Sequence, residues 1–162
     1  MVIGAFMLFG VVSNNFQRLV LDSTESLDSN TNMQSAITIA RSMMDEITSK
    51  PFDVSFTAKK VVRLSDLGSC GRASGEYYPN INDCDDYHGL TFVSPPRGTT
   101  PSTTPRCLWG TEGDTIRCFV QYVSQTNPQQ TVTGVSWAKR VTVTVTSRYS
   151  TYPLTMSHVV TY

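Results

Sequence analysis

The sequence predicts an α+β fold in which a long N-terminal helix packs on a C-terminal antiparallel β-sheet. The helix is expected over residues 1–50, because an apolar start leads into a stretch where apolar side chains recur every three or four positions. A β-rich globular head domain is expected over residues 51–162, where apolar and polar side chains alternate. No second helical pattern separates the predicted strands, and strands joined by loops alone form antiparallel sheets.

The first part of this helix, residues 1–21, is predicted to be an apolar segment that leaves the head. Met1 to Val12 contains no polar side chain, and the first ionisable side chain is Arg18. Twelve apolar residues are fewer than the about 20 that a membrane span needs, but an extension to Leu21 would suffice if Arg18 reached the interface. A cleaved signal and a buried core helix are alternatives, although the run continues into Ser13-Asn14-Asn15 and not into a small-residue cleavage site.

Residues 22–50 are predicted to be the amphipathic part of the helix. Asp22 and Glu25 have the spacing of a capping box, and Pro51 ends the pattern. Asp45 and Glu46 lie near the C-terminal end, where the helix dipole disfavours acids, so we expect them to be exposed or partnered by the head. The side chains expected to pack helix against head are Met33, Ile37, Ala40, Met44 and Ile47.

The alternation predicts four stretches of strand in the head. They are residues 54–59, 118–123, 135–146 and 154–162. Residues 65–115 between them are irregular, and structureless loops of that length usually carry function or need covalent bridges.

All four cysteines lie within or just after this irregular region, and none has the spacing of a metal site. An even number in loop-rich sequence predicts two disulfides and an oxidising compartment. Three pairings are possible, and Cys70–Cys84 with Cys107–Cys118 closes the shortest loops. Four free thiols are the alternative.

An oxygen-rich turn is a weak candidate for calcium, which binds six to eight oxygen ligands. Cys84 falls where an oxygen is needed and no glutamate closes the loop, so a solvated turn is the main interpretation. No other metal and no cofactor are expected. The candidate ligands are Asn82, Asp83, Asp85 and Asp86.

The composition and the missing motifs exclude several classes of function. The 13 basic and 13 acidic residues cancel, so no surplus of positive charge is available for nucleic acid. Only 16% of residues are charged, while 21 Thr and 18 Ser supply hydroxyls, which suggests a surface that packs against protein. The sequence contains no nucleophile elbow, phosphate loop or zinc-protease motif. His88 and His158 offer no base with an orienting partner, so an enzyme, with a secreted hydrolase as the alternative, is not expected.

Two stretches resemble type IV pilin-like proteins, particularly minor pilins and type II secretion pseudopilins. Residues 36–53 are similar to the end of the N-terminal helix of that group, and residues 137–162 are similar to its last sheet strands. The glutamate that the family usually carries one turn into the mature helix is replaced by Ala5, so assembly is expected to depend on apolar packing. The residues expected to pack in the assembly are Met1, Val2, Ile3, Phe6, Met7, Phe9, Val12, Phe16 and Leu19.

The resemblance implies a bacterial subunit that is held in the inner membrane by its helix. Pilus or secretion assembly machinery would then extract it into an extracellular helical filament of its own copies at the cell surface. Two alternatives remain open. One is a pseudopilin or minor tip pilin in secretion or adhesion, and the other is a membrane-anchored periplasmic binding domain.

Overall fold

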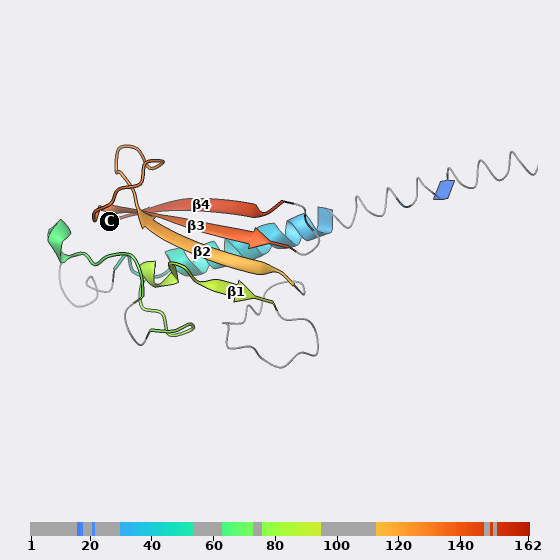
Figure 1. Cartoon of the computed structure of the whole chain (residues 1–162), viewed down its shortest axis with the longest axis horizontal. Helices are drawn as coiled ribbons and strands as arrows, with labels where there is room; N and C mark the ends of the chain where they lie inside the picture. Colours follow the sequence, from blue (N-terminus) through green and yellow to red (C-terminus); the bar gives the residue numbers. More distant parts are fainter. Residues whose placement is uncertain are drawn as a thin grey trace, which may run out of the picture.

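The computed structural model describes residues 16–17, 21, 30–53, 63–72, 76–94, 113–147, 150 and 152–162. One continuous helix in this part of the chain spans residues 30–48 (Figure 1). The other elements are the short 3₁₀ helices η1 (Leu64–Asp66) and η2 (Asp85–Tyr87) and the strands β1 (Thr91–Val93), β2 (Thr115–Tyr122), β3 (Ala138–Thr146) and β4 (Leu154–Thr161).

The four strands form one antiparallel sheet in the order β1-β2-β3-β4, which is also their order along the chain. The central pairs are long and in unbroken register, with Thr115 opposite Thr146 in β2 and β3 and with Val145 opposite Leu154 in β3 and β4. By contrast, β1 pairs with β2 over three residues only. The sheet therefore has a short edge strand on one side and a long one, β4, on the other.

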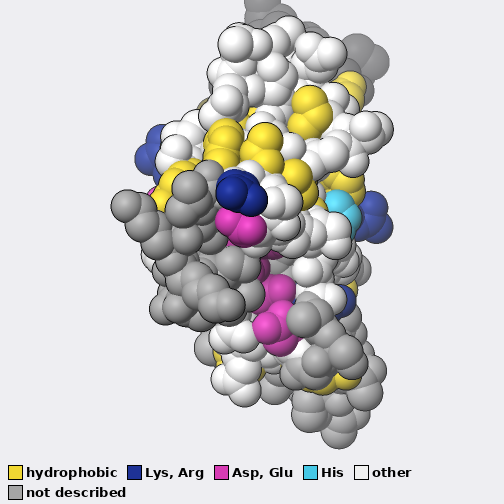
Figure 2. All heavy atoms as spheres, turned by 90° about the vertical axis from the view of Figure 1, so that its left-hand side faces the viewer, with side chains coloured by type: hydrophobic (Ala, Val, Ile, Leu, Met, Phe, Trp, Pro, Cys, Tyr) yellow, Lys and Arg dark blue, Asp and Glu magenta, His cyan; other side chains and the backbone are white. Residues whose placement is uncertain are grey.

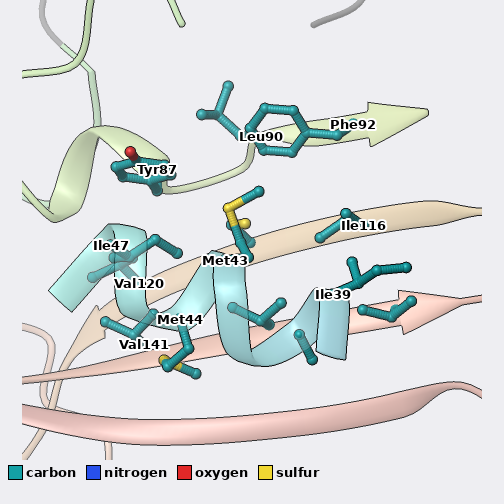
Figure 3. Close-up of a cluster of buried hydrophobic side chains, with 14 of the residues drawn as sticks. Ile39, Met43, Met44, Ile47, Tyr87, Leu90, Phe92, Ile116, Val120 and Val141 are labelled. Atoms are coloured by element: carbon teal, nitrogen blue, oxygen red, sulfur yellow. The ribbon is translucent and has the colours of Figure 1, made fainter. Parts of the chain in front are cut away.

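The helix at 30–48 runs along one face of the sheet, and the hydrophobic core lies between them (Figures 1 and 3). In β3, every second side chain from Val141 to Val145 points into this core and is fully buried, because side chains alternate across a strand. Helix side chains at spacings of three and four fill the other side. Those that are buried are Ala36, Ile39, Ala40, Met43, Met44 and Ile47.

The predicted strands of the C-terminal half are confirmed, with shifted boundaries. β2 begins at Thr115, and β3 begins only at Ala138. Residues before Ala138 alternate as a strand would, but they fold back beside β2, where Val132 N donates to Tyr122 O (3.1 Å). The predicted strand at 54–59 lies outside the described residues.

The predicted fold class is wrong. The long N-terminal helix is not found, since the continuous helix of the described residues spans 30–48, and strands hold more residues than helix does. The sheet covers the apolar face of this helix from Ala36 to Ile47. Tertiary packing of this kind supplies most of the stability of a helix in a protein. The disulfide-stapled loops are also not found, because no disulfide exists among the described residues.

Candidate functional site

The side chains predicted to pack the helix against the head lie at different depths. Ala40, Met44 and Ile47 are buried against the sheet and Ile37 is half-buried, whereas Met33 is 51% exposed. Sequence reasoning missed Ala36 and Ile39. Both are buried and lie three or four positions from Ala40 and Met43, so the helical period could have identified them.

Large apolar side chains are exposed on the N-terminal side of this packed region. Phe16 is 64% exposed, Leu21 67% and Met33 51%. Of the predicted assembly residues, only Phe16 is described, and residues 1–15 and Leu19 lie outside the described part. Within the described ranges, no helix has the length and apolar content needed to cross a membrane.

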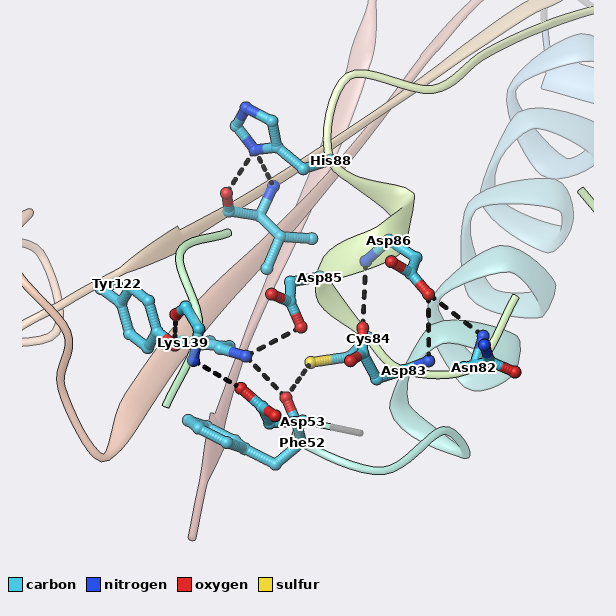
Figure 4. Close-up of polar contacts among 12 residues, drawn as sticks. Phe52, Asp53, Asn82, Asp83, Cys84, Asp85, Asp86, His88, Tyr122 and Lys139 are labelled. Carbon is cyan, nitrogen blue, oxygen red and sulfur yellow. Dashed lines mark hydrogen bonds and ion pairs between the residues drawn. The ribbon is translucent and has the colours of Figure 1, made fainter. Parts of the chain in front are cut away.

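A buried ion pair lies beyond the C-terminal end of the helix, under η2 (Figure 4). Lys139 Nζ contacts Asp85 Oδ1 at 2.9 Å and donates to Phe52 O at 2.6 Å, and the lysine side chain is fully buried. Its Nζ also lies 4.3 Å from the ring centroid of Phe52 and 5.0 Å from that of Tyr122, a cation–π arrangement. The pair attaches the chain after the helix and η2 to strand β3.

Two tyrosine hydroxyls strengthen this attachment. Tyr122 Oη donates to Gly68 O at 2.7 Å, and burial raises the pKa of Tyr122. Tyr87 Oη donates to Glu46 Oε1 at 2.7 Å, and burial together with this bond raises the pKa of Tyr87. Glu46 is therefore partnered by the head, and Asp45 is exposed, as the helix dipole led us to expect. These contacts are structural, because their charges and hydroxyls are used internally.

The weak calcium candidates are also used within the protein. Asp86 Oδ2 accepts from the backbone N–H groups of Asn82 (3.1 Å) and Asp83 (3.3 Å), and Asp83 Oδ1 accepts from Asp86 N (3.2 Å). Burial raises the pKa of Asp86. Asp85 is bound to Lys139, and the part of the chain that the structure describes has no group of three or more His, Cys, Asp or Glu side chains that could hold a metal ion.

The predicted Cys70–Cys84 disulfide is wrong, because both residues are free thiols. Cys84 is fully buried and its Sγ lies 3.3 Å from Phe52 O, while Cys70 is half-buried. Burial raises the pKa of Cys70 to about 11 and that of Cys84 to about 12, so both thiols are protonated at neutral pH. Cys118 is buried in β2, and its predicted partner Cys107 lies outside the described residues. The spacing of cysteines in the sequence did not reveal that Cys84 and Cys118 lie in the hydrophobic core.

The two histidines lie at different strands, His88 beside β2 and His158 in β4. His88 Nδ1 contacts both the backbone N–H and the backbone carbonyl of Val120, and its ring lies 4.5 Å from that of Phe119 (Figure 4). His158 is exposed on β4 opposite Val141. Among the described residues, neither histidine contacts a carboxylate that would orient it as a catalytic base.

The end of the molecule near the C-terminus presents a band of hydrophobic side chains, with acidic side chains below it (Figure 2). Trp137 stacks on Tyr162 with ring centroids 5.4 Å apart. Trp137 also lines an open hollow of about 350 Å³. Its other described lining residues are uncharged: Leu64, Ser124, Gln125, Thr126, Val132, Val135 and Ser136.

The outer face of the sheet, turned away from the helix, is rich in hydroxyl groups. Thr142 and Ser157 pair across β3 and β4 at 3.3 Å, and Thr144 and Thr155 pair at 3.2 Å. This face is polar without carrying many charges, so it can approach another neutral protein surface without repulsion.

Comparisons of the chain with protein-family models, with curated proteins and with solved structures find no match.

Proposed function

We propose that this protein is a structural subunit of an extracellular, pilus-like filament, and that copies assemble through the apolar N-terminal segment with the head exposed. Before assembly, the same segment would hold the subunit in the inner membrane. The proposal concerns the apolar residues of the segment and the surface of the head, and it needs no disulfide.

The observation that carries this proposal is the exposure of Phe16, Leu21 and Met33 on the N-terminal side of a core that is already packed. Each of the three is more than half exposed, whereas helix residues from Ala36 onward fill the inner face of the sheet. The sequence before them, Met1 to Val12, adds twelve residues without a polar side chain. An apolar surface of this kind is stabilised when lipid or protein covers it.

The surface of the head also supports repeated packing of identical copies. The net charge of the chain is zero, and the outer face of the sheet carries paired Thr and Ser hydroxyls. Identical subunits with several like charges would repel one another in a close stack, and this chain avoids that cost.

The test is a charged substitution in the apolar segment, Phe9→Asp, in the full-length chain. We expect filaments to disappear from shear fractions viewed by negative-stain electron microscopy, because a carboxylate buried among apolar neighbours costs several kcal/mol. The head should keep its thermal melting temperature by circular dichroism, because the helix–sheet core begins at Ala36.

The matched control is Tyr152→Asp, which places the same charge at an aromatic residue of the head that is 81% exposed. This variant should assemble as the unmodified chain does. Filaments formed by Phe9→Asp, or a complete absence of filaments from the unmodified chain, would refute the proposed function.

A further inference from the structure

The backbone groups of β2 and β4 that point away from β3 differ in whether they have partners. An exposed strand edge is a template for pairing with another chain, and proteins usually protect it with a cover, a charge, a proline or a bulge. The side of β2 that faces away from β3 is covered, in part by β1, whereas within the described residues the outer side of β4 is not.

On β2, the backbone groups that point away from β3 have partners at four successive alternate residues. Ile116 pairs with Phe92 of β1, and Cys118 N donates to Leu90 O (2.9 Å) while Gly89 N donates to Cys118 O (3.0 Å). The His88 ring then contacts both backbone groups of Val120, and Tyr122 O accepts from Val132 N. A strand, loop residues and a side chain together cover this side of β2.

The backbone groups on the open edge of β4 can be identified from the ladder. Tyr162 N donates to Trp137 O (3.0 Å), so this pair is hydrogen-bonded, and such pairs alternate with non-bonded ones in an antiparallel ladder. The alternation continues at Val160, His158, Met156 and Leu154, which face β3. The N–H and C=O groups that point outward therefore belong to Thr155, Ser157, Val159 and Thr161.

Nothing in the described part of the chain pairs with this outer edge of β4. The side chains of Thr155, Ser157 and Thr161 are exposed. Strand β4 contains no Lys, Arg, Asp, Glu or Pro, and its eight residues stay in unbroken register with β3, so it has no protective charge, proline or bulge of its own.

We propose that β4 pairs with β4 of a second copy of this chain, antiparallel and about a twofold axis at His158. In this register Thr155 lies opposite Thr161 of the second copy and Ser157 lies opposite Val159, so every outward backbone group is paired. Residues directly opposite each other share a face. On the outer face the Thr155 and Thr161 hydroxyls therefore meet and Ser157 meets Val159, while Met156 meets Val160 on the helix side.

A second copy is the occupant that the composition of β4 favours. The strand carries no Lys, Arg, Asp or Glu, so pairing with itself places no formal charge opposite a like one. About His158, Thr155 mirrors Thr161 and Met156 mirrors Val160, while Ser157 mirrors Val159. A twofold contact closes on itself and does not propagate, so it is an interaction additional to the proposed filament contact and independent of it.

Cysteine cross-linking in the full-length chain tests the register. Two copies of residue 158 would lie opposite each other as a non-hydrogen-bonded pair with Cα atoms about 4.5 Å apart, a separation that suits a disulfide. We expect His158→Cys to give a covalent dimer on a non-reducing gel after mild oxidation in detergent. Thr155→Cys is the matched control, because its two copies would lie roughly 20 Å apart.

A charge exchange tests the same pairing without cysteines. In Thr155→Lys/Thr161→Lys, lysines from the two copies oppose each other, and we expect dimerisation to weaken by about tenfold or more in sedimentation velocity. In Thr155→Lys/Thr161→Glu, opposite charges meet and the dimer should persist. Both positions are exposed, so both variants should melt as the unmodified chain does.

The proposal is overturned if Thr155→Cys cross-links as well as His158→Cys, or if neither does. It is also overturned if the two charge variants dimerise equally. Loss of filaments in Phe9→Asp, with retained cross-linking at residue 158, would separate this contact from assembly through the apolar segment.

Discussion

Lys139 is a charged residue at a position where its strand otherwise carries valines. It lies two residues before Val141 on the core face of β3, and it is fully buried between Asp85 and Phe52 O. Removing one partner of a buried pair leaves the other charge in a medium that solvates it poorly. Each charge of the pair therefore needs the other, and together they are expected to hold η2 against β3.

Substituting Lys139 by Met should lower the free energy of unfolding by about 3–5 kcal/mol, because the Asp85 carboxylate would stay buried without its partner. The control is Arg140→Met, whose guanidinium contacts only exposed backbone carbonyls of Pro128 and Gln129 and should cost about 1 kcal/mol. Urea denaturation measures both. The double variant Lys139→Met/Asp85→Leu should recover much of the loss. Equal effects of Lys139→Met and Arg140→Met would contradict this role.

The buried thiol of Cys84 is expected to make the free energy of unfolding depend on pH in the alkaline range. Burial raises its pKa from 9.0 to about 12, so the unfolded chain releases this proton first as the pH rises. Between these values the unfolded state binds fewer protons than the folded state, and the free energy of unfolding falls as pH increases. Below pH 9 the contribution is fully present.

In Cys84→Ala this fall should be shallower between pH 9 and pH 11, because one titrating group with a raised pKa has been removed. Urea denaturation at several pH values measures the slope for both chains. Parallel curves for the variant and the unmodified chain would show that the Cys84 thiol does not contribute.

At the scale of elements, the helix at 30–48 depends on the sheet that covers it. Its buried face extends from Ala36 to Ile47, while Met33 near its start is exposed. The stripe read from the sequence identified the buried C-terminal part, because three- and four-residue spacing places side chains on one face. It could not show where cover by the sheet begins, because that depends on how far the strands extend along the helix.

Ile47→Ala should lower the free energy of unfolding by about 2–5 kcal/mol, because the side chain is fully buried and its removal leaves a cavity. Ile37→Ala makes the same chemical change at a half-buried position of the same helix and should cost less. Chemical denaturation compares the two, and an equal loss would mean that the sheet covers Ile37 as fully as Ile47.

At the scale of the whole molecule, the chain offers different surfaces for different contacts. Phe16, Leu21 and Met33 are exposed on the N-terminal side, β4 forms a long edge of the sheet, and the hollow lined by Trp137 lies near the C-terminus. The filament contact and the β4 contact use different residues, so Phe9→Asp and the β4 variants should act separately. Substitutions more than about 10 Å apart with no shared partners usually have additive effects.

The sequence by itself determined the strands β2, β3 and β4, because period-two alternation in Val- and Thr-rich runs depends only on neighbours along the chain. It also placed Lys139 in the same register as Val141. Only the tertiary structure decided that Asp85 reaches this lysine, that Cys70 and Cys84 remain thiols, and that no described residue pairs with the outer side of β4. These features join residues far apart in the chain, and sequence spacing does not specify which distant groups meet.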